Sequence, residues 1–283
     1  VVYTHGLVGS ASIYSNQTMS LAALGYVVVS ITHTDGSSPV VKLPDDSLLY
    51  YDHDLVKLWY EGRKEEYTRI RRDRTSHRSE EMIAATEAMH RLASSGSLPN
   101  KGPSFLGKIH TDRTTFMGHS FGACTALTAA TRRPDLVKQV VAHEPALDWT
   151  PDDTLGSLFS KERTKGLNNT FDGGLGGFKE VPIASSIHDL DLLLMFSGEW
   201  KRKGEAWNHL LHEMHLDKRL GRKDGHSALH YIEEAHHTEF SDTSMLMPLW
   251  LSRVSGLTGT RNPLDTGREI QQYTTRFLQA VHN

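Results

Sequence analysis

The stretch TTFMGHSFGACTALTAAT, residues 114–131, carries the strongest local signal in the chain. It opens with a short apolar run typical of a buried strand, turns at GHSFG, and continues into a predicted helix from Phe121 to Thr131. A serine on a sharp strand-to-helix turn has an exposed hydroxyl, and the crowded backbone of such a turn requires glycine on both sides. The helix N-terminus that follows can stabilise negative charge beside the serine. The sequence therefore predicts Ser120 as a nucleophile.

Short apolar runs bounded by turn residues recur on both sides of this stretch and predict strands at 1–4, 26–31, 114–117, 137–142, 192–196 and 229–232. Between them lie segments of helical period at 13–24, 82–93, 121–131, 204–216, 241–254 and 266–281. Alternating strands and helices indicate an α/β fold, with a mostly parallel central sheet covered by helices on both faces.

We expect one domain over residues 1–283, interrupted by two insertions. The stretch 39–62 mixes polar turns with apolar clusters, and 150–189 is rich in Gly, Ser, Asp and Thr. Since Val1 is not a methionine and already opens an apparent strand, we expect the domain to be incomplete at its N-terminus, with any targeting segment out of view.

Charge and composition exclude several classes of protein. The 31 Lys and Arg against 34 Asp and Glu give a net charge of -3, so no large positive field is available to hold a nucleic acid. No apolar run approaches the roughly 20 residues that cross a bilayer. Cys124 is the single cysteine, which favours a reducing compartment, in the cytoplasm or at a membrane periphery, and leaves secretion open.

An acyl-transfer site also needs two donors for an oxyanion. One should be the N–H of Phe121, directly after the nucleophile. The other should come from the loop after an earlier strand, where His5-Gly6 follows the first apolar run, and Leu7 N–H is our candidate.

The base and the acid should follow the nucleophile in the order Ser, acid, His. The histidines after the last predicted strand are His236, His237 and His282, and the adjacent pair occupies the expected place. For the acid, counting strands favours Glu144, directly after the strand at 137–142, over Asp148.

We expect neither a metal nor a cofactor. His209, His212 and His215 recur every third residue and drift round a helix, so they do not converge on one ion. No phosphate-binding glycine loop is present. The mixed charge run at 63–74 is typical of a solvated helix face with ion pairs.

Four blocks of the chain resemble the platelet-activating factor acetylhydrolases of the plasma and intracellular type II group. They are THGL at 4–7 with LGYVV at 24–28 and His33, DR at 112–113 leading into GHSFGA, the strand that ends at Glu144, and HTEFSD at 237–242. The resemblance implies an α/β-hydrolase fold, Ser120 as nucleophile and the Leu7 and Phe121 amides as oxyanion hole. The last block, in which the family has a catalytic His separated from Phe by two residues, implies His237 as base. The family has Asp at the strand end, where this chain has Glu144.

The resemblance also implies a metal-independent serine esterase that cleaves the sn-2 short-chain acyl ester of platelet-activating factor and related phospholipids. A phospholipase A1 or general carboxylesterase of the same fold is the nearest alternative, and a non-catalytic lipid-binding module comes from another class. The expected partners are a phospholipid substrate and a membrane or lipoprotein surface.

Overall fold

The computed structural model describes residues 1–96, 105–159, 190–203, 206–216, 220–221 and 227–280. Six parallel strands form a sheet in the order β2-β1-β5-β6-β7-β8. The strands are β1 (Val2–Thr4), β2 (Val29–Ile31), β5 (Thr115–His119), β6 (Gln139–His143), β7 (Asp191–Ser197) and β8 (Ala228–Ile232). Each predicted strand is present, and β5, β6 and β7 are buried along their whole length, as in a parallel sheet covered on both faces.

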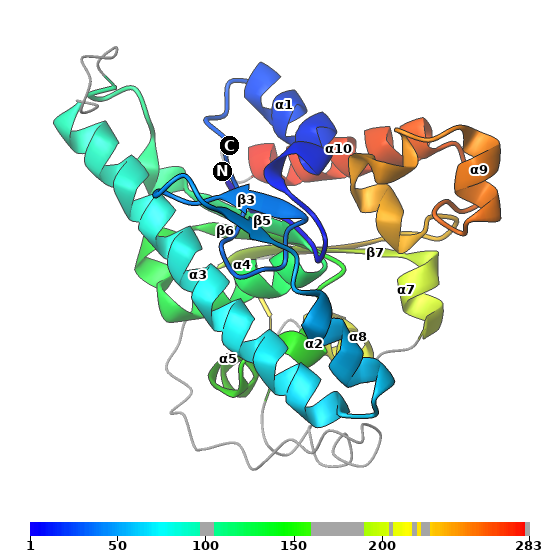
Figure 1. Cartoon of the computed structure of the whole chain (residues 1–283). Helices are drawn as coiled ribbons and strands as arrows, with labels where there is room; N and C mark the ends of the chain where they lie inside the picture. The colour runs from blue at the N-terminus through cyan, green and yellow to red at the C-terminus, as the bar shows by residue number, and fades with distance from the viewer. Residues whose placement is uncertain (97–104, 160–189, 204–205, 217–219, 222–226, 281–283) are drawn as a thin grey trace.

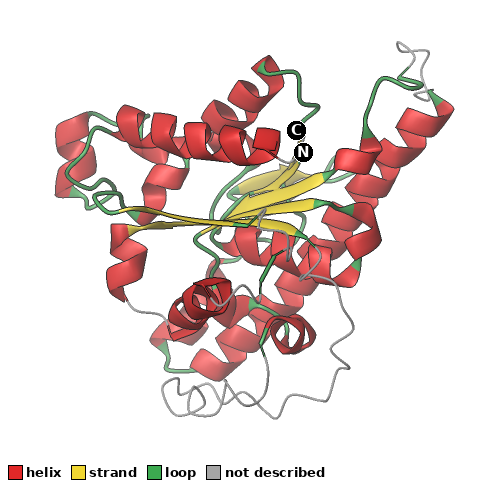
Figure 2. Ribbon diagram, turned by 180° about the vertical axis from the view of Figure 1, so that it is seen from behind, coloured by secondary structure: helices red, strands yellow, loops and turns green. Residues whose placement is uncertain are grey.

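Helices cover both faces of this sheet (Figures 1 and 2). On one face lie α1 (Ser15–Ala23) and α10 (Pro263–Ala280). On the other lie α3 (Lys64–Ser95) and α4 (Phe121–Arg132), with α5 (Asp152–Leu158) and α8 (Ala206–Leu216) beyond. This architecture is the α/β-hydrolase fold, which confirms the predicted fold class.

The remaining elements belong to connections. A hairpin of β3 (Val40–Lys42) and β4 (Leu48–Tyr50), followed by α2 (His53–Tyr60), fills the stretch predicted as the first insertion. The second predicted insertion contains α5, and its residues 160–189 lie outside the described part of the chain. After β7 come α7 (Gly198–Lys203) and, further on, α9 (Leu249–Val254).

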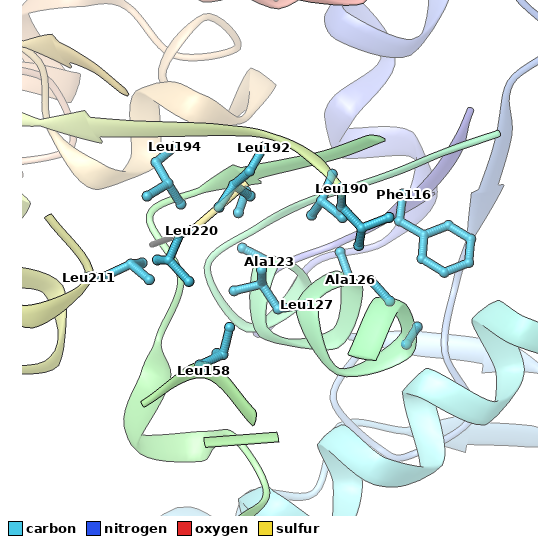
Figure 3. Packing of buried hydrophobic residues seen from close by; sticks show 14 of the residues in the cluster. Phe116, Ala123, Ala126, Leu127, Leu158, Leu190, Leu192, Leu194, Leu211 and Leu220 are labelled. Carbon is cyan, nitrogen blue, oxygen red and sulfur yellow. The ribbon is translucent and has the colours of Figure 1, made fainter. Parts of the chain in front are cut away.

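Small side chains of α4 allow this helix to pack closely under the sheet. Figure 3 shows Ala123, Ala126 and Leu127 of α4 beneath Leu192 and Leu194 of β7, and all five are buried. Interdigitated apolar side chains pack at about the density of an organic crystal, which leaves a helix little room to shift. The N-terminus of α4, where Ser120 lies, is therefore held firmly against the sheet.

Two predicted features are wrong in part. The helix predicted at 241–254 is instead the 3-10 turn η8 (Asp242–Ser244) and the short α9, because Pro248 has no N–H and disfavours helix in the residue before it. The charge run at 63–74 is not a wholly solvated face. Arg71 is buried, with its guanidinium carbon 4.9 Å from the ring centroid of Tyr67 and 5.4 Å from that of Trp149, since aromatic faces can accept a guanidinium.

The helices that follow the neighbouring strands β1 and β5 lie on opposite faces of the sheet. These strands are hydrogen-bonded neighbours, with Thr4 opposite Gly118, but β1 leads to α1 on one face and β5 to α4 on the other. In open α/β sheets a crevice forms at such a point, beyond the carboxyl ends of the strands. The Leu7 loop and Ser120 both lie there.

Within the described residues, no helix combines the length and apolar character needed to cross a membrane.

Candidate active site

Ser120 adopts a backbone conformation that serines rarely adopt, with φ 56° and ψ -119°. Its turn is as crowded as predicted. A Cβ on Gly118 would lie 2.4 Å from the Gly122 carbonyl, and a Cβ on Gly122 would lie 2.1 Å from the Thr4 carbonyl oxygen. The Ser120 N–H donates to the His143 carbonyl at 2.8 Å. The two glycines therefore permit the close contacts that hold the serine at the end of β5.

His237 brings its imidazole against this serine. Its Nε2 lies 2.9 Å from Ser120 Oγ, and its Nδ1 is hydrogen-bonded to Glu144 Oε2. A carboxylate accepts only, so Nδ1 carries the proton and Nε2 is free to accept from the serine hydroxyl. This is the arrangement in which a histidine can act as a general base toward serine.

Glu144 lies directly after β6, beside the nucleophile strand, in the left-handed region with φ 50°. Its side chain is fully buried, and Oε1 accepts from the Ser197 N–H while Oε2 faces His237. Of the two acids left open above, the one that contacts the imidazole is Glu144. Asp148 lies in η4 (Leu147–Trp149).

Of the other two histidine candidates, His236 is the one within the described residues, and it contacts a different group. The Nδ1 of His236 is 3.0 Å from the Gly256 carbonyl oxygen. His282 falls outside the described residues.

Residues after β7 hold His237 in place. Glu199 Oε2 accepts from the His237 N–H at 2.8 Å, and the indole of Trp200 stacks on the imidazole with ring centroids 4.2 Å apart and an interplanar angle of 12°. Sequence reasoning assigned no role to Trp200. Its only sequence signal is its position shortly after the predicted strand at 192–196.

The two predicted oxyanion donors flank the serine. Phe121 is the first residue of α4, where backbone N–H groups have no partner within the helix. On the other side, a Cβ on Gly6 would lie 3.3 Å from Ser120 Cβ, so the loop after β1 touches the nucleophile. The amides on either side of Leu7 are engaged, Gly6 N–H with Tyr14 Oη at 3.0 Å and Val8 N–H with the Ser37 carbonyl at 2.9 Å.

The direction of the Leu7 amide is set through its own peptide unit. The Gly6 carbonyl of that unit accepts from Gly9 N–H at 3.1 Å and lies 2.7 Å from His5 Nδ1. His5 Nε2 accepts from the His33 N–H at 3.2 Å, which places the His5 proton on Nδ1. Because the C=O and N–H of a trans peptide point in opposite directions, the Leu7 N–H points away from both donors.

Burial keeps the histidines around the site neutral. It lowers the pKa of the His119 imidazole well below its ordinary value, and the nearby His237 and His143 lower that pKa further. Burial likewise lowers the pKa of His143 to about 3. The serine and its partners are therefore surrounded by neutral rings.

One group of donor atoms in the described residues is compact enough for a metal ion. Side-chain atoms of His119, Glu144 and His237 lie within 4.8 Å of one another. Both nitrogens of His237 already form hydrogen bonds, to Glu144 and Ser120, so an ion there would have to replace one of them. The hydrogen-bonded arrangement is suited to proton transfer.

The fold and this serine–histidine–carboxylate arrangement define the chain as an α/β-hydrolase. The family model described as platelet-activating factor acetylhydrolase, isoform II, matches residues 1–145, just over half of the chain. The chain belongs to this family. A second model, of the prolyl oligopeptidase family, matches residues 106–246.

Individual relatives are more distant. The platelet-activating factor acetylhydrolase of Gallus gallus is 27% identical over 147 residues, which are 47% of this chain and 35% of that protein, so the match spans about a third of the relative's length. Two solved structures are similar. One, from a study titled "LipS and LipT, two metagenome-derived lipolytic enzymes increase the diversity of known lipase and esterase families", has a TM-score of 0.43 at 13% identity, covering 90% of this chain and 92% of that chain. The other is dienelactone hydrolase from Anabaena variabilis, with a TM-score of 0.36 at 16% identity, covering 90% and 81%.

Proposed function

We propose that this protein is a serine esterase that hydrolyses the sn-2 short-chain acyl ester of platelet-activating factor and related phospholipids. The observation that carries the proposal is the hydrogen-bonded series from Ser120 Oγ through His237 to Glu144, on a strained turn at the end of β5. Membership of the acetylhydrolase family supports the substrate class.

Acylation follows from the placement of these groups. His237 Nε2 takes the hydroxyl proton as Ser120 Oγ attacks the ester carbonyl carbon. The carbonyl oxygen becomes an oxyanion, which the amides of Leu7 and Phe121 stabilise. Glu144 stabilises the imidazolium that forms.

The same proton path runs in reverse to complete acylation, and deacylation then repeats the cycle with water. The tetrahedral intermediate collapses, the bond from the acyl carbon to the glycerol oxygen breaks, and His237 gives its proton to that oxygen, releasing the lysophospholipid. Water then attacks the acyl-serine while His237 takes a proton from it. Collapse of the second intermediate returns the proton to Ser120 Oγ and releases the acid. Atoms and protons balance with water as the single co-reactant.

Replacing the nucleophile tests the proposal. Ser120→Ala should abolish hydrolysis of 1-alkyl-2-acetyl-glycerophosphocholine and covalent labelling by a fluorophosphonate, because no other hydroxyl lies against the His237 imidazole among the described contacts. The matched control is Ser255→Ala, a serine on the surface after α9, which should retain both. Labelling that survives Ser120→Ala would refute the assignment.

Product analysis tests the substrate. With a phospholipid that carries distinguishable acyl chains, release from sn-2, and faster turnover of acetyl than of long chains, is the expected result. Release from sn-1 would instead indicate a phospholipase A1, and equal turnover of simple esters a general carboxylesterase. Lipid binding with no turnover and no fluorophosphonate adduct would indicate a binding module.

We further propose that the enzyme meets its substrate at a phospholipid surface, of a membrane or a lipoprotein. Apolar side chains in and before α9 support this, since Leu246, Trp250 and Val254 are 75%, 68% and 81% exposed. They follow the His237 turn in the chain. Apolar side chains that insert among lipid headgroups gain burial that water does not offer them.

A further inference from the structure

We propose that Tyr14 is a positioning residue, whose hydroxyl ties the oxyanion loop to the histidine that lies beside Glu144. Tyr14 ends the 3-10 turn η1 (Ala11–Tyr14) before α1, and it is 2% exposed. Its Oη accepts from the Gly6 N–H at 3.0 Å and lies 2.9 Å from His119 Nδ1. The inference rests on the proposed esterase function.

The direction of the second hydrogen bond follows from the Tyr14 proton, for which His119 Nδ1 is the one acceptor among the described contacts. A phenol has one proton, and with Gly6 N–H as donor the Tyr14 hydroxyl is free to donate that proton to His119 Nδ1. Burial raises the pKa of Tyr14 far above its ordinary value, so the proton is retained. His119 is neutral, and with Nδ1 accepting, its own proton is on Nε2.

This tautomer suits the carboxylate that faces it. His119 Nε2 lies 4.0 Å from Glu144 Oε2, beyond hydrogen-bond distance, and has no hydrogen-bond partner in the part of the chain described. With the proton on Nε2, the ring presents positive partial charge to Glu144. With the other tautomer it would present a lone pair to a buried carboxylate and leave the Tyr14 proton without an acceptor, at a cost typical of an unsatisfied buried group.

The same hydroxyl also positions the loop that carries Leu7. The N–H that Tyr14 holds belongs to Gly6, whose carbonyl shares a peptide unit with the Leu7 amide. A Cβ on Gly6 would lie 2.9 Å from Tyr14 Oη and 3.3 Å from Ser120 Cβ, so the loop lies between the tyrosine and the nucleophile. Losing this contact allows the Leu7 donor to move relative to Ser120.

Tyr14 is itself held from the far end of the chain. Asp242 Oδ2 accepts from Ser15 Oγ at 2.7 Å, and both carboxylate oxygens lie within 3.3 Å of the Asn16 N–H. Asp242 belongs to η8, just after η7 (His237–Phe240), the turn that carries the base. The nucleophile, oxyanion loop and base are therefore connected through η1 and α1.

Removing one oxygen atom tests the proposal, and the chain supplies a matched control. Tyr3 packs on Tyr14 with ring centroids 5.0 Å apart, is equally buried, and its hydroxyl has no hydrogen-bond partner in the described structure. We expect Tyr14→Phe to lower kcat for p-nitrophenyl acetate about tenfold to a hundredfold, as for a small misplacement of catalytic groups, with KM changed less than threefold. Tyr3→Phe should stay within twofold of the wild type in both.

Two outcomes would overturn the proposal: Tyr14→Phe indistinguishable from Tyr3→Phe, or a rise in KM with kcat intact. An independent measurement uses the unaltered protein. The imidazole ¹⁵N shifts of His119, assigned with His119→Gln, should report the Nε2–H tautomer, and the Nδ1–H tautomer would refute the proposal even if Tyr14→Phe did not fold. If the wild type itself hydrolyses no ester, the proposed function fails, while the NMR result still tests the Tyr14 contact.

Discussion

At the scale of single residues, Glu144 and Ser120 share an uncommon backbone. Both follow neighbouring parallel strands and have φ near 50°, a region in which non-glycine residues are found mainly where the surrounding structure holds them. The hydrogen bonds of Ser120 N–H to His143 and of Glu144 N–H to Met195 continue the sheet ladder beyond the strand ends. The ladder thus places nucleophile and acid side by side.

Glu144→Gln should lower kcat about a thousandfold to ten-thousandfold while the protein stays folded. Gln Oε1 can still accept from the Ser197 N–H, which turns the amide NH₂ toward His237 Nδ1 and moves the imidazole proton to the nitrogen that faces Ser120. The measurement is steady-state turnover of p-nitrophenyl acetate beside a circular dichroism spectrum. Asp148→Asn serves as control and should keep most activity; the opposite ranking of the two variants would contradict the geometry.

Sequence reasoning reached part of this site. The glycines around Ser120 reflect a local steric requirement, so the motif can be recognised without coordinates. The acid remained open between two positions because a strand end cannot be located to one residue from an apolar run. Tyr14 and Trp200 were missed, since the contacts of Tyr14 with His119 and of Trp200 with His237 join residues more than 30 positions apart.

At the scale of elements, α3 combines a charged exterior with buried arginines. Arg78 is fully buried, donates through Nη2 to Thr4 Oγ1 at 3.2 Å and to the His5 carbonyl, and its guanidinium carbon lies 4.3 Å from the Phe121 ring centroid. The helix is thereby fastened to the end of β1 and the start of α4. The apolar periodicity of the sequence predicted only residues 82–93 of this helix. The arginines of its first half suggested a helix face exposed to solvent.

Arg78→Met should reduce the free energy of unfolding by about 3 kcal/mol. Methionine fills much of the volume but leaves the His5 carbonyl and Thr4 hydroxyl without their buried donor. Urea denaturation measures the change. Arg69→Met on the same helix, with a side chain 66% exposed, should alter stability by less than about 0.5 kcal/mol. Equal effects of the two variants would exclude a structural role for the buried contacts.

At the scale of the whole molecule, buried histidines make stability depend on pH. Burial lowers the pKa of His5, His119 and His143 below that of an unfolded chain, which is about 6.5. Below that pH the unfolded chain binds more protons than the folded protein. This stability is therefore complete above pH 6.5 and is lost as the pH falls toward the folded-state pKa values.

Between pH 7.5 and 5.5 each of these three histidines should cost about 1.4 kcal/mol of unfolding free energy, or about 4 kcal/mol together. Burial also lowers the pKa of His33, which adds to this loss in the same direction. Urea denaturation at the two pH values measures the difference. In His143→Gln the loss of unfolding free energy between pH 7.5 and 5.5 should be about 1.4 kcal/mol smaller than in the wild type. A pH-independent midpoint would show that the rings are protonated in the folded state.

The exposed apolar side chains in and before α9 lead to a separate prediction, on lipid binding. The double variant Trp250→Asp with Leu246→Asp should bind phosphatidylcholine vesicles at least tenfold more weakly, as measured by co-sedimentation, because the exposed apolar area is lost. Turnover of soluble p-nitrophenyl acetate should be unchanged. Vesicle binding that persists would place the lipid contact on another surface.

The length of the side chain at position 144 acts as a spacer between β6 and the turn that carries the base. Aspartate would tolerate the left-handed backbone better than glutamate does. Its carboxylate, however, would stop about one C–C bond, ~1.5 Å, short of the imidazole. In a homologue with aspartate here, the β6 end and the His237 turn must approach each other by that amount. Exchanging the two acids alone, without the loops that frame them, should therefore leave the imidazole without its carboxylate partner.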